Sequence, residues 1–561
     1  MRLPFDLSSW HRSILLTCLA IQIGPLSQAQ YDPDAREPAR KLNGSLVLHG
    51  GGKLDERVRE TFIQLAGGDK AKIVIIPSAS ANIASDEELL EKWKTYPTAS
   101  LRSLHADSRD TAESDAILAA IKEATGVWFN GGDQERLESL YVGNNFESEL
   151  LQVLERGGVV GGSSAGAAIA TKVMISRGEK RQGFDLLPES IVDQHFVQRN
   201  REARLLKMLA SHPDRIGVGI DEDTALIVRG RRMVAVGSST VDLYLAPSQH
   251  LPLFKKTLHQ GEFADLIALH RSALARLADP FPPLPAPVPF VPKGTLFIVG
   301  GGGVPAGMLE QFIDKAGGPD APIVYVPCLE QEDASRDQFD VILRRAGAKN
   351  VTKLHTKDRK KANSDDSFLA PLQDARGIWF GGGRQWNFVD SYQNTKAHQL
   401  MLAVLERGGA IAGSSAGASI QGDYMPRGDP LGNLNIIAPG YERGLGFLCG
   451  VAIDQHFAQR NRFKDMTSLI QTYPQLLGIG IDESTALIVQ GHVAEVVGAG
   501  KVAFYDAQSP EWLSATKATS PEQEDEKSSR ADTTIPVKDH ISLKAGECFH
   551  LKDRKIVEKA P

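Results

Sequence analysis

The sequence of 561 residues is poor in cysteine, in excess basic charge and in long apolar stretches, and each shortage excludes a class of protein. Its four cysteines include no C-x-x-C pair, so the sequence predicts neither a disulfide framework nor a structural zinc site. The net charge of −6 leaves no basic excess of the kind that binds nucleic acid or a membrane surface. With 42% apolar and 24% charged residues, the composition is that of a globular protein with several domains.

Residues 1–29 have the pattern of a signal peptide. Arginines precede an apolar run at 13–26, and the segment 27–29 then places small residues before a cut at Gln30. The run is short for a transmembrane helix, and the residues around Cys18 fit a lipoprotein anchor poorly. We therefore expect an exported protein, periplasmic or extracellular, that has no membrane attachment once this segment is removed.

Four sequence blocks occur twice in the same order, which indicates a tandem duplication. The pairs are VWFNGGDQ at 127–134 with IWFGGGRQ at 378–385, LERGGVVGGSSAGAAI at 154–169 with LERGGAIAGSSAGASI at 405–420, DQHFVQRNR at 193–201 with DQHFAQRNR at 454–462, and GVGIDEDTALIV at 217–228 with GIGIDESTALIV at 478–489. The second copy has ten more residues between its GSSAG block and its DQHF block.

A proline-rich stretch separates the copies. Residues 280–292 contain seven prolines, which exclude a helix or a central strand and predict a semi-rigid spacer. We therefore expect a first domain over 30–279 and a second over 293–561. Within the second domain, the polar and charged segment 515–534 is predicted to be a disordered insertion, after which 541–551 supplies the last strands.

Short apolar runs alternate with amphipathic stretches in each half. In the first half, the runs at 45–52, 71–80, 126–132 and 157–164 contain β-branched residues and end in glycine, serine or proline. Strands that are buried on both faces and joined by helices form parallel sheets, so we predict two tandem α/β domains with doubly wound parallel sheets. Ligands bind beyond the carboxyl ends of such strands, which is where these turns fall.

Both copies of G-x-S-x-G follow a predicted strand and open a predicted helix, which is the context of a nucleophile elbow. The central residues are Ser164 and Ser415, and the flanking glycines permit a strained turn that exposes one hydroxyl. A phosphate-binding turn at the start of a helix uses the same residue types and is the alternative. Two copies, each followed by candidate partners at matched spacing, favour the nucleophile.

A serine nucleophile needs a base, and the base needs an acid that orients it. Of the 14 histidines, His195 and His456 are the pair that recurs in an identical block of both halves. The candidate acids are the neighbours 221–222 and 482–483, each an Asp-Glu pair after strand-like sequence. Adjacent strand residues face opposite ways, so one of each pair faces the histidine, and the spacing leaves that choice open.

GGDQ, GGSSAGA, DQHF with trailing arginines and GIDE-x-TA, in this order, resemble the cyanophycinase and aspartyl-dipeptidase family of serine exopeptidases, peptidase family S51. The likeness covers most of both halves and implies an α/β fold similar to class I glutamine amidotransferases. It also implies two Ser–His–Glu triads, namely Ser164, His195, Glu222 and Ser415, His456, Glu483. The implied oxyanion hole consists of backbone N–H groups of Gly131, Gly132 and Ala165, and in the repeat of Gly382, Gly383 and Ala416.

Arginines after each histidine indicate what the substrate carries. Three arginines in a net acidic protein suggest a carboxylate-rich ligand, although an exposed helix face would give the same charges. Cyanophycinases, which release β-aspartyl-arginine dipeptides from an arginine-decorated polyaspartate, carry such arginines. The resemblance implies substrate-binding residues Gln134, Asp193, Gln194, Arg199, Arg201 and Arg204, and in the repeat Gln385, Asp454, Gln455, Arg460 and Arg462. Asp465 stands where the first half has Arg204, which argues against identical specificity.

We therefore expect an exported serine exopeptidase that cleaves aspartyl or β-aspartyl bonds, with cyanophycin as its substrate and with no metal or cofactor. A dipeptidase for small Asp-containing peptides is one alternative, and a binding protein with one or both halves non-catalytic is another. The intact serines and histidines favour the enzyme. The shorter serine-to-histidine segment of the first half predicts a more open or impaired first site.

Overall fold

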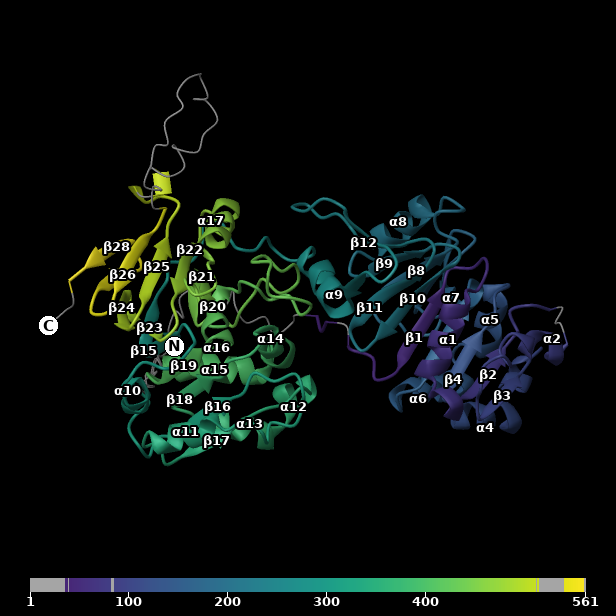
Figure 1. Ribbon diagram of the computed structural model, residues 1–561, viewed down its shortest axis with the longest axis horizontal. Helices are drawn as coiled ribbons and strands as arrows, with labels where there is room; N and C mark the ends of the chain where they lie inside the picture. The colour runs from purple at the N-terminus through teal and green to yellow at the C-terminus, as the bar shows by residue number, and fades with distance from the viewer. Residues whose placement is uncertain (1–35, 39, 82–84, 511, 514–538, 559–561) are drawn as a thin grey trace, which may run out of the picture.

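The computed structural model describes residues 36–38, 40–81, 85–510, 512–513 and 539–558. The predicted signal peptide and the predicted insertion at 515–534 lie outside these residues. Strands β1–β14 form the sheets of one lobe and β15–β28 those of a second, and Figure 1 shows the two lobes side by side. The predicted α/β fold in two tandem units is confirmed.

The first lobe has an eight-stranded sheet with the order β14-β11-β10-β1-β5-β4-β2-β3. Its strands are β1 (Ser45–His49), β2 (Lys72–Ile76), β3 (Ser100–Ser103), β4 (Gly126–Phe129), β5 (Val159–Ser163), β10 (Thr224–Arg229), β11 (Arg232–Gly237) and β14 (Phe263–Asp265). The neighbouring strands β1, β5, β4, β2 and β3 are parallel, as predicted. On the other side of β1, the antiparallel strands β10, β11 and β14 extend the sheet.

A smaller sheet and a hairpin complete the first lobe. The smaller sheet has the order β13-β12-β9-β8, with β8 (Ser190–Gln194), β9 (Ile216–Ile220), β12 (Val241–Leu245) and β13 (Phe254–Leu258), and the hairpin pairs β6 (Val173–Ser176) with β7 (Glu179–Gln182). Strands β8 and β9 are parallel, so their carboxyl ends lie together.

Helices cover both faces of the large sheet because alternate strand residues point to opposite faces. Val47 packs with Phe62 and Trp128 on the face covered by α1 (Glu56–Leu65) and α2 (Asp86–Glu91), whereas Leu46 and Leu48 belong to the core on the other face. That second face carries α3 (Arg109–Ala112), α4 (Asp115–Glu123), α5 (Gln134–Tyr141), α6 (Asn145–Glu155) and α7 (Ala165–Ala168). The other helical elements are η1 (Gly68–Lys70), α8 (Glu202–Ser211) and α9 (Leu266–Ala275).

The second lobe repeats this plan. Its large sheet has the order β17-β16-β18-β19-β15-β23-β24-β27-β28, with β15 (Val291–Val299), β16 (Ile323–Val326), β17 (Val351–Lys353), β18 (Gly377–Phe380), β19 (Ala410–Ser414), β23 (Thr485–Gly491), β24 (Val493–Gly498), β27 (Cys548–His550) and β28 (Lys555–Val557). Its smaller sheet has the order β20-β21-β22-β25-β26, with β20 (Gly422–Tyr424), β21 (Leu448–Gln455), β22 (Leu477–Ile481), β25 (Lys501–Tyr505) and β26 (Ile541–Lys544).

The helices of the second lobe are distributed in the same way. One face of the large sheet carries α10 (Met308–Lys315) and α11 (Phe339–Arg345). The other carries α12 (Arg359–Ser364), α13 (Asp366–Gln373), α14 (Trp386–Tyr392), α15 (Lys396–Glu406) and α16 (Ala416–Ser419), and α17 (Phe463–Thr472) packs on the smaller sheet.

The proline-rich stretch packs on the second lobe and does not stand free as a spacer. Phe281 stacks on Tyr424 with ring centroids 6.0 Å apart, and the Pro289 carbonyl lies 2.9 Å from Nδ1 of His492. Strand β15 already begins at Val291, inside the stretch that was predicted to exclude a central strand. The pairing of β15 with β23 shifts register between Val291 and Leu296. The prediction missed this start because the chain buries the apolar Val291 against the second lobe.

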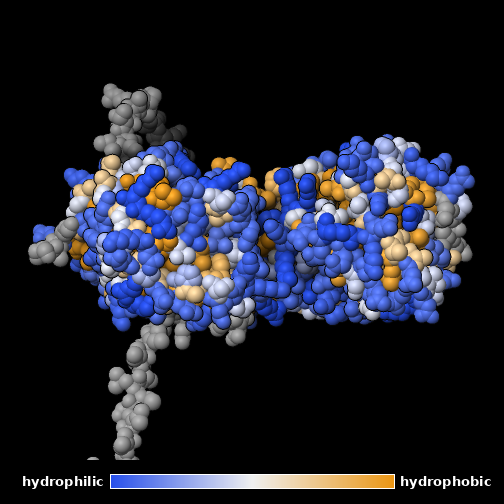
Figure 2. Space-filling model, turned by 90° about the horizontal axis from the view of Figure 1, so that it is seen from below, coloured by the Kyte–Doolittle hydropathy of each residue, from blue (hydrophilic) through white to orange (hydrophobic). Residues whose placement is uncertain are grey.

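Hydrophilic residues cover most of the visible face in Figure 2, with apolar residues in small scattered groups. Within the described ranges, no helix has the length and apolar character needed to cross a membrane. Of the three described cysteines, Cys328 and Cys548 are buried and Cys449 is partly buried. No group of three or more histidine, cysteine, aspartate or glutamate side chains in this part of the chain is arranged to hold a metal ion.

Candidate active site

Ser164 lies in a sharp turn between the carboxyl end of β5 and α7. Its backbone angles, φ 53° and ψ −107°, fall outside the helix and strand regions and therefore carry strain. Two glycines make the turn possible, because a side-chain carbon on Gly162 would lie 2.5 Å from the backbone of Gly166. Ser415 repeats the conformation with φ 58° and ψ −113°. Both serines thus have the elbow geometry that the sequence predicts.

Each serine hydroxyl is hydrogen-bonded to a histidine that contacts a glutamate. Oγ of Ser164 lies 2.8 Å from Nε2 of His195, and Nδ1 of His195 lies 2.5 Å from Oε1 of Glu222. In the second lobe the corresponding distances are 2.9 and 2.6 Å, between the same atoms of Ser415, His456 and Glu483. This order of hydroxyl, imidazole and carboxylate is the arrangement of a nucleophile, its base and an orienting acid.

The histidine and the glutamate come from the smaller sheet, and the serine comes from the larger one. His195 follows β8 and Glu222 follows β9, so the carboxyl ends of two neighbouring parallel strands carry them to the serine. The geometry also settles the choice within the Asp-Glu pair. The carboxylate of Asp221 accepts hydrogen bonds from the backbone N–H groups of Val197 and Gln198, at 3.0 and 3.1 Å, and so fixes the chain after the histidine.

The glycine turn after β1, which contains none of the individually predicted site residues, supports the histidine. Gly51 has φ 110°, and a side-chain carbon there would lie 2.2 Å from Cε1 of His195. Gly301 has the same relation to His456, at 2.3 Å. The signal that could have found this support is the triplet Gly-Gly-Gly, which recurs at 50–52 and 300–302.

The predicted oxyanion donors lie beside the serine. A side-chain carbon on Gly131 would be 3.3 Å from Cβ of Ser164, so the turn after β4 touches the nucleophile. In the described part of the chain, the N–H groups of Gly131 and Gly132 have no backbone acceptor, and Ala165 is the first residue of α7. Free amide groups at this position can bind a negatively charged oxygen. Gly382 lies at a similar 3.5 Å from Ser415.

Two of the three predicted substrate-binding arginines in the first lobe hold a buried carboxylate. Arg204 donates from Nε to Asp193 at 2.6 Å and forms a second, shorter hydrogen bond from Nη2. Arg201 donates to the carbonyl of Gln194 at 2.8 Å and lies 3.5 Å from Asp193. This contradicts the expectation that all three face a ligand, because the fully buried Asp193 needs paired charges. Arg199 is exposed, and its side chain has no ion pair or hydrogen bond within the described residues.

The second lobe reaches the same electrostatic arrangement from another part of the chain. Asp454 is paired with Arg462 at 2.6 Å, as Asp193 is with its helix arginines. Asp465 stands at the position of Arg204, so Asp454 lacks the arginine partner that Arg204 provides to Asp193. Arg427 takes that place, and it donates to Asp454 at 3.0 Å and to Asp465 at 2.5 Å. Arg460 is exposed like Arg199. The charge reversal at Asp465 is therefore compensated within the longer segment that follows Ser415.

The predicted glutamines that follow the two glycine turns, Gln134 and Gln385, make different contacts. Gln194 donates to Oε1 of Gln134 at 3.0 Å, and Gln134 itself donates to the carbonyl of Ile175 in the hairpin. Gln385 instead donates to the carbonyl of Pro426 at 2.7 Å. The glutamine after each glycine turn thus anchors the segment that follows the serine. In the first lobe that segment contains the hairpin β6–β7, and in the second it is the longer stretch 425–447.

Burial lowers the pKa of His195 below its usual value of 6.5. The hydrogen bond that Glu222 accepts from His195 opposes this effect, and the charge of Arg199 adds to it. The same causes, in the same order, lower the pKa of His456, with Glu483 opposing burial. Both imidazoles are therefore neutral near pH 7 and able to accept a proton.

Comparison with known proteins identifies the family. Residues 46–236 and 296–497 match peptidase family S51. The chain is 33% identical to a cyanophycinase of Synechococcus elongatus over 241 residues, which cover 39% of this chain and 73% of the relative. It is 34% identical to a cyanophycinase of Trichormus variabilis over 227 residues, which cover 37% and 76%. A crystal structure of a peptidase from an acI-B1 Actinobacterium aligns with 40% of this chain and 98% of its own, at 25% identity and a TM-score of 0.34. This chain therefore belongs to peptidase family S51, as a tandem of two such segments.

Proposed function

We propose that this protein is an exported serine exopeptidase that hydrolyses aspartyl and β-aspartyl peptide bonds in both lobes. The hydrogen-bonded series of serine, histidine and glutamate, which occurs twice, is the observation that carries the proposal. Membership of the peptidase family supports it. The signal-peptide pattern of residues 1–29 supports export, and N-terminal sequencing of secreted protein, with Gln30 as the expected first residue, tests that part.

The reaction begins when Oγ of Ser164 attacks the scissile carbonyl carbon and His195 takes the hydroxyl proton at Nε2. Glu222 accepts the Nδ1–H hydrogen bond and stabilises the imidazolium that forms. Amide groups of Ala165 and of the glycine turn stabilise the oxyanion of the tetrahedral intermediate. The histidine then donates its proton to the leaving amine, and an acyl-enzyme remains. Water attacks this ester with the histidine as base, which releases the acid product and restores the serine.

The exposed arginine beside each histidine points to a substrate with free carboxylates. Arg199 and Arg460 follow their histidines at the same interval, and both guanidinium groups lie within electrostatic range of the imidazole. A guanidinium group can hold a carboxylate by two parallel hydrogen bonds. A peptide or polyaspartate substrate meets this requirement, and cyanophycin is the substrate that the family resemblance favours.

Mass analysis of products after incubation with cyanophycin and with Asp-X dipeptides tests the substrate assignment. Release of β-aspartyl-arginine from the polymer supports the proposal. Cleavage of the dipeptides alone identifies the protein as a dipeptidase for small Asp-containing peptides. No hydrolysis of either substrate leaves the binding-protein alternative.

Replacement of both nucleophiles tests the chemistry. We expect Ser164→Ala with Ser415→Ala to lower kcat by about 10⁴-fold or more, because the acyl-enzyme cannot form. The melting temperature should stay near that of the unchanged protein, since the substitution removes one partly exposed hydroxyl per site. Each single variant should retain part of the turnover. Full activity in the double variant would refute the serine mechanism.

The lowered histidine pKa predicts the pH profile of the first site, measured in the Ser415→Ala background. The neutral imidazole is the active form, so kcat/KM should rise with pH through a pKa below 6.5 and then reach a plateau. Arg199→Gln removes a positive charge that helps to lower this pKa, so the acidic limb should move to higher pH. A limb that stays in place, or moves to lower pH, contradicts this electrostatic assignment.

The glycine beneath the histidine gives a further prediction. Gly51→Ala should lower kcat/KM of the first site by about 100-fold, because the added methyl group displaces His195 from the serine. Gly157→Ala is the matched control, since Gly157 also has positive φ, 88°, but has nothing within 4 Å of the added carbon. Both variants are measured with Ser415→Ala, and equal losses in the two would mean that backbone strain alone is responsible.

A further inference from the structure

Helix α14 lies at the contact between the two lobes, and it begins directly after the glycine turn of the second site. In Figure 1, α9 of the first lobe lies next to α14. Arg231, in the tight turn between β10 and β11, places its guanidinium carbon 4.5 Å from the ring centroid of Trp386, the first residue of α14. Its Nη1 donates to Asp390, one turn further along, at 2.7 Å. A cation of the first lobe therefore rests on a helix of the second site.

The same arginine contacts the segment 425–447 of the second lobe. Nη2 of Arg231 donates to Oη of Tyr441 at 2.6 Å, and the Tyr441 hydroxyl donates to Asp390 at 2.6 Å. Asp265, the N-cap residue of α9, accepts two further hydrogen bonds from Arg231. One guanidinium group thus joins α9, α14 and segment 425–447, which belongs to the longer serine-to-histidine connection of the second lobe.

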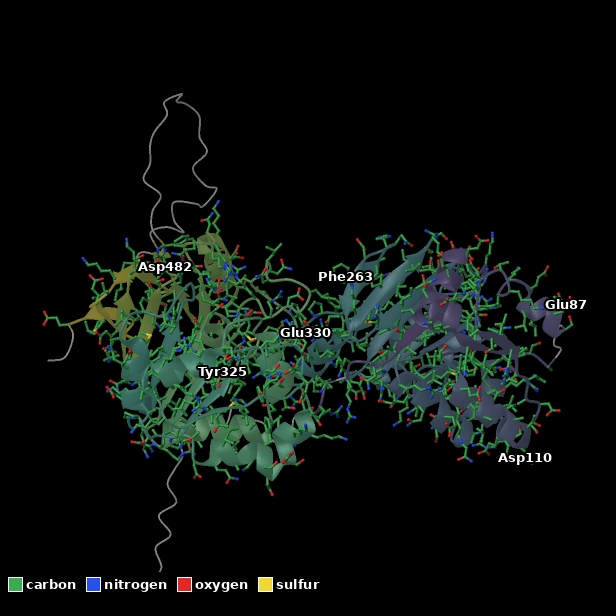
Figure 3. The ribbon with its side chains drawn as sticks, turned by 60° about the horizontal axis from the view of Figure 1, so that its bottom comes forward. Glu87, Asp110, Phe263, Tyr325, Glu330 and Asp482 are labelled. Atoms are coloured by element: carbon green, nitrogen blue, oxygen red, sulfur yellow. The ribbon has the colours of Figure 1, made fainter. Side chains whose placement is uncertain are left out.

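Arg271 makes a second connection from α9. It donates to the carbonyl of Val389 at 3.2 Å and to Oε1 of Gln393 at 2.8 Å, at the carboxyl-terminal end of α14. Positive charge at this end of a helix is favourable. In Figure 3, Phe263 of β14, the strand that leads into α9, lies on the side of the first lobe that faces the second.

The charges at this contact are shielded from solvent. Side chains of Arg231 and Asp390 are 15% and 14% exposed. Burial by itself would raise the pKa of Asp390, but the charges of Arg231 and Arg271 outweigh it and hold this pKa below its usual value. Removal of one partner would leave an uncompensated buried charge, which is strongly destabilising.

Direct contacts connect this region to the second site. Gln385, the N-cap position of α14, donates to the carbonyls of Pro426 and Arg427 at 2.7 and 3.1 Å. Arg427 in turn holds Asp454, two residues before His456. The first lobe therefore supports α14 and the segment 425–447, and these two elements hold residues beside the second triad.

The first site is supported differently. Its equivalent helix, α5, is held by the hairpin of its own lobe, because Glu135 accepts hydrogen bonds from Ser176 at 2.8 Å and from Arg181 at 3.3 Å. Both of these donors belong to β6–β7. In the second site, segment 425–447 of the same lobe makes comparable contacts, and the first lobe adds the hydrogen bonds of Arg231 and Arg271 to α14 and the residue after it.

We propose that the first lobe is a positioning partner for the second site, with Arg231 as its principal positioning residue. The second site then depends on the folded first lobe and not on the chemistry of Ser164. The effect that this proposal predicts on kcat/KM rests on the function proposed above. The effect that it predicts on the stability of α14 and segment 425–447 does not. An experiment with both readouts separates the two.

The experiment uses the full chain with Ser164→Ala, so that turnover reports the second site. We expect Arg231→Met to lower kcat/KM by about tenfold or more and to raise KM, because Gln385 and Arg427 lose their fixed positions. Arg231→Lys should recover part of the loss, since it keeps the charge without the planar fork. The matched control is Arg229→Met, an exposed arginine two residues away, which should behave like the unchanged protein. In the Ser415→Ala background, Arg231→Met should leave the first site within about twofold.

Hydrogen–deuterium exchange provides the readout that needs no activity. Peptides from 384–393 and 425–447 should exchange faster in Arg231→Met than in Arg229→Met, while peptides of α5 stay unchanged. Equal exchange in both variants overturns the proposal. A second outcome also overturns it: kcat falls in proportion to the fraction of Ser415 that reacts in an active-site titration, while KM and hydrogen–deuterium exchange stay unchanged. That result would mean only that less of the protein is folded. If the Ser164→Ala parent has no activity, the proposed function of the second site fails, and the exchange result alone decides the positioning role.

Discussion

The close approach of glycine backbones at the elbow determines where the other groups of each site must lie. A side-chain carbon on Gly166 would lie 2.3 Å from the carbonyl oxygen of Phe129, so α7 rests directly on the end of β4. This contact brings Ser164 beside the glycine turn that follows β4. Gly417 repeats the approach on Phe380 at 2.2 Å. A larger residue at either position would lift the helix and separate the hydroxyl from its amide donors.

The two sheets of each lobe divide the chemistry between them. The large sheet supplies the nucleophile and the amide groups, and the smaller sheet supplies the base and the acid. Phe196 packs on the smaller sheet, 2.4 Å from where a side-chain carbon on Gly219 would be. Glycine in β9 allows the phenylalanine ring after the histidine to pack flat on the strand that carries the glutamate.

Repeats and local patterns predicted much of this arrangement. The duplicated blocks indicated two lobes, the apolar runs indicated the parallel strands, and the elbow serines took the predicted conformation. Contacts between distant parts of the chain could not be predicted in this way. Arg427 lies outside the four duplicated blocks, so its pairing with Asp454 left no trace in their spacing. The antiparallel strands beyond β1 and the packing of the proline-rich stretch likewise depend on tertiary burial, which local sequence does not encode.

Figure 1 shows that the lobes use different surfaces where they meet, so the contact is head-to-tail and not two-fold symmetric. A contact of this kind can in principle be repeated indefinitely, because each added unit offers the same free surface to the next one. The residue of the second lobe that corresponds to Arg231 is His492, and the proline-rich stretch covers it, with the Phe290 ring 4.4 Å away and the Pro289 carbonyl within 2.9 Å. The segment that links the lobes thus also covers the surface of the second lobe that corresponds to the Arg231 surface of the first lobe.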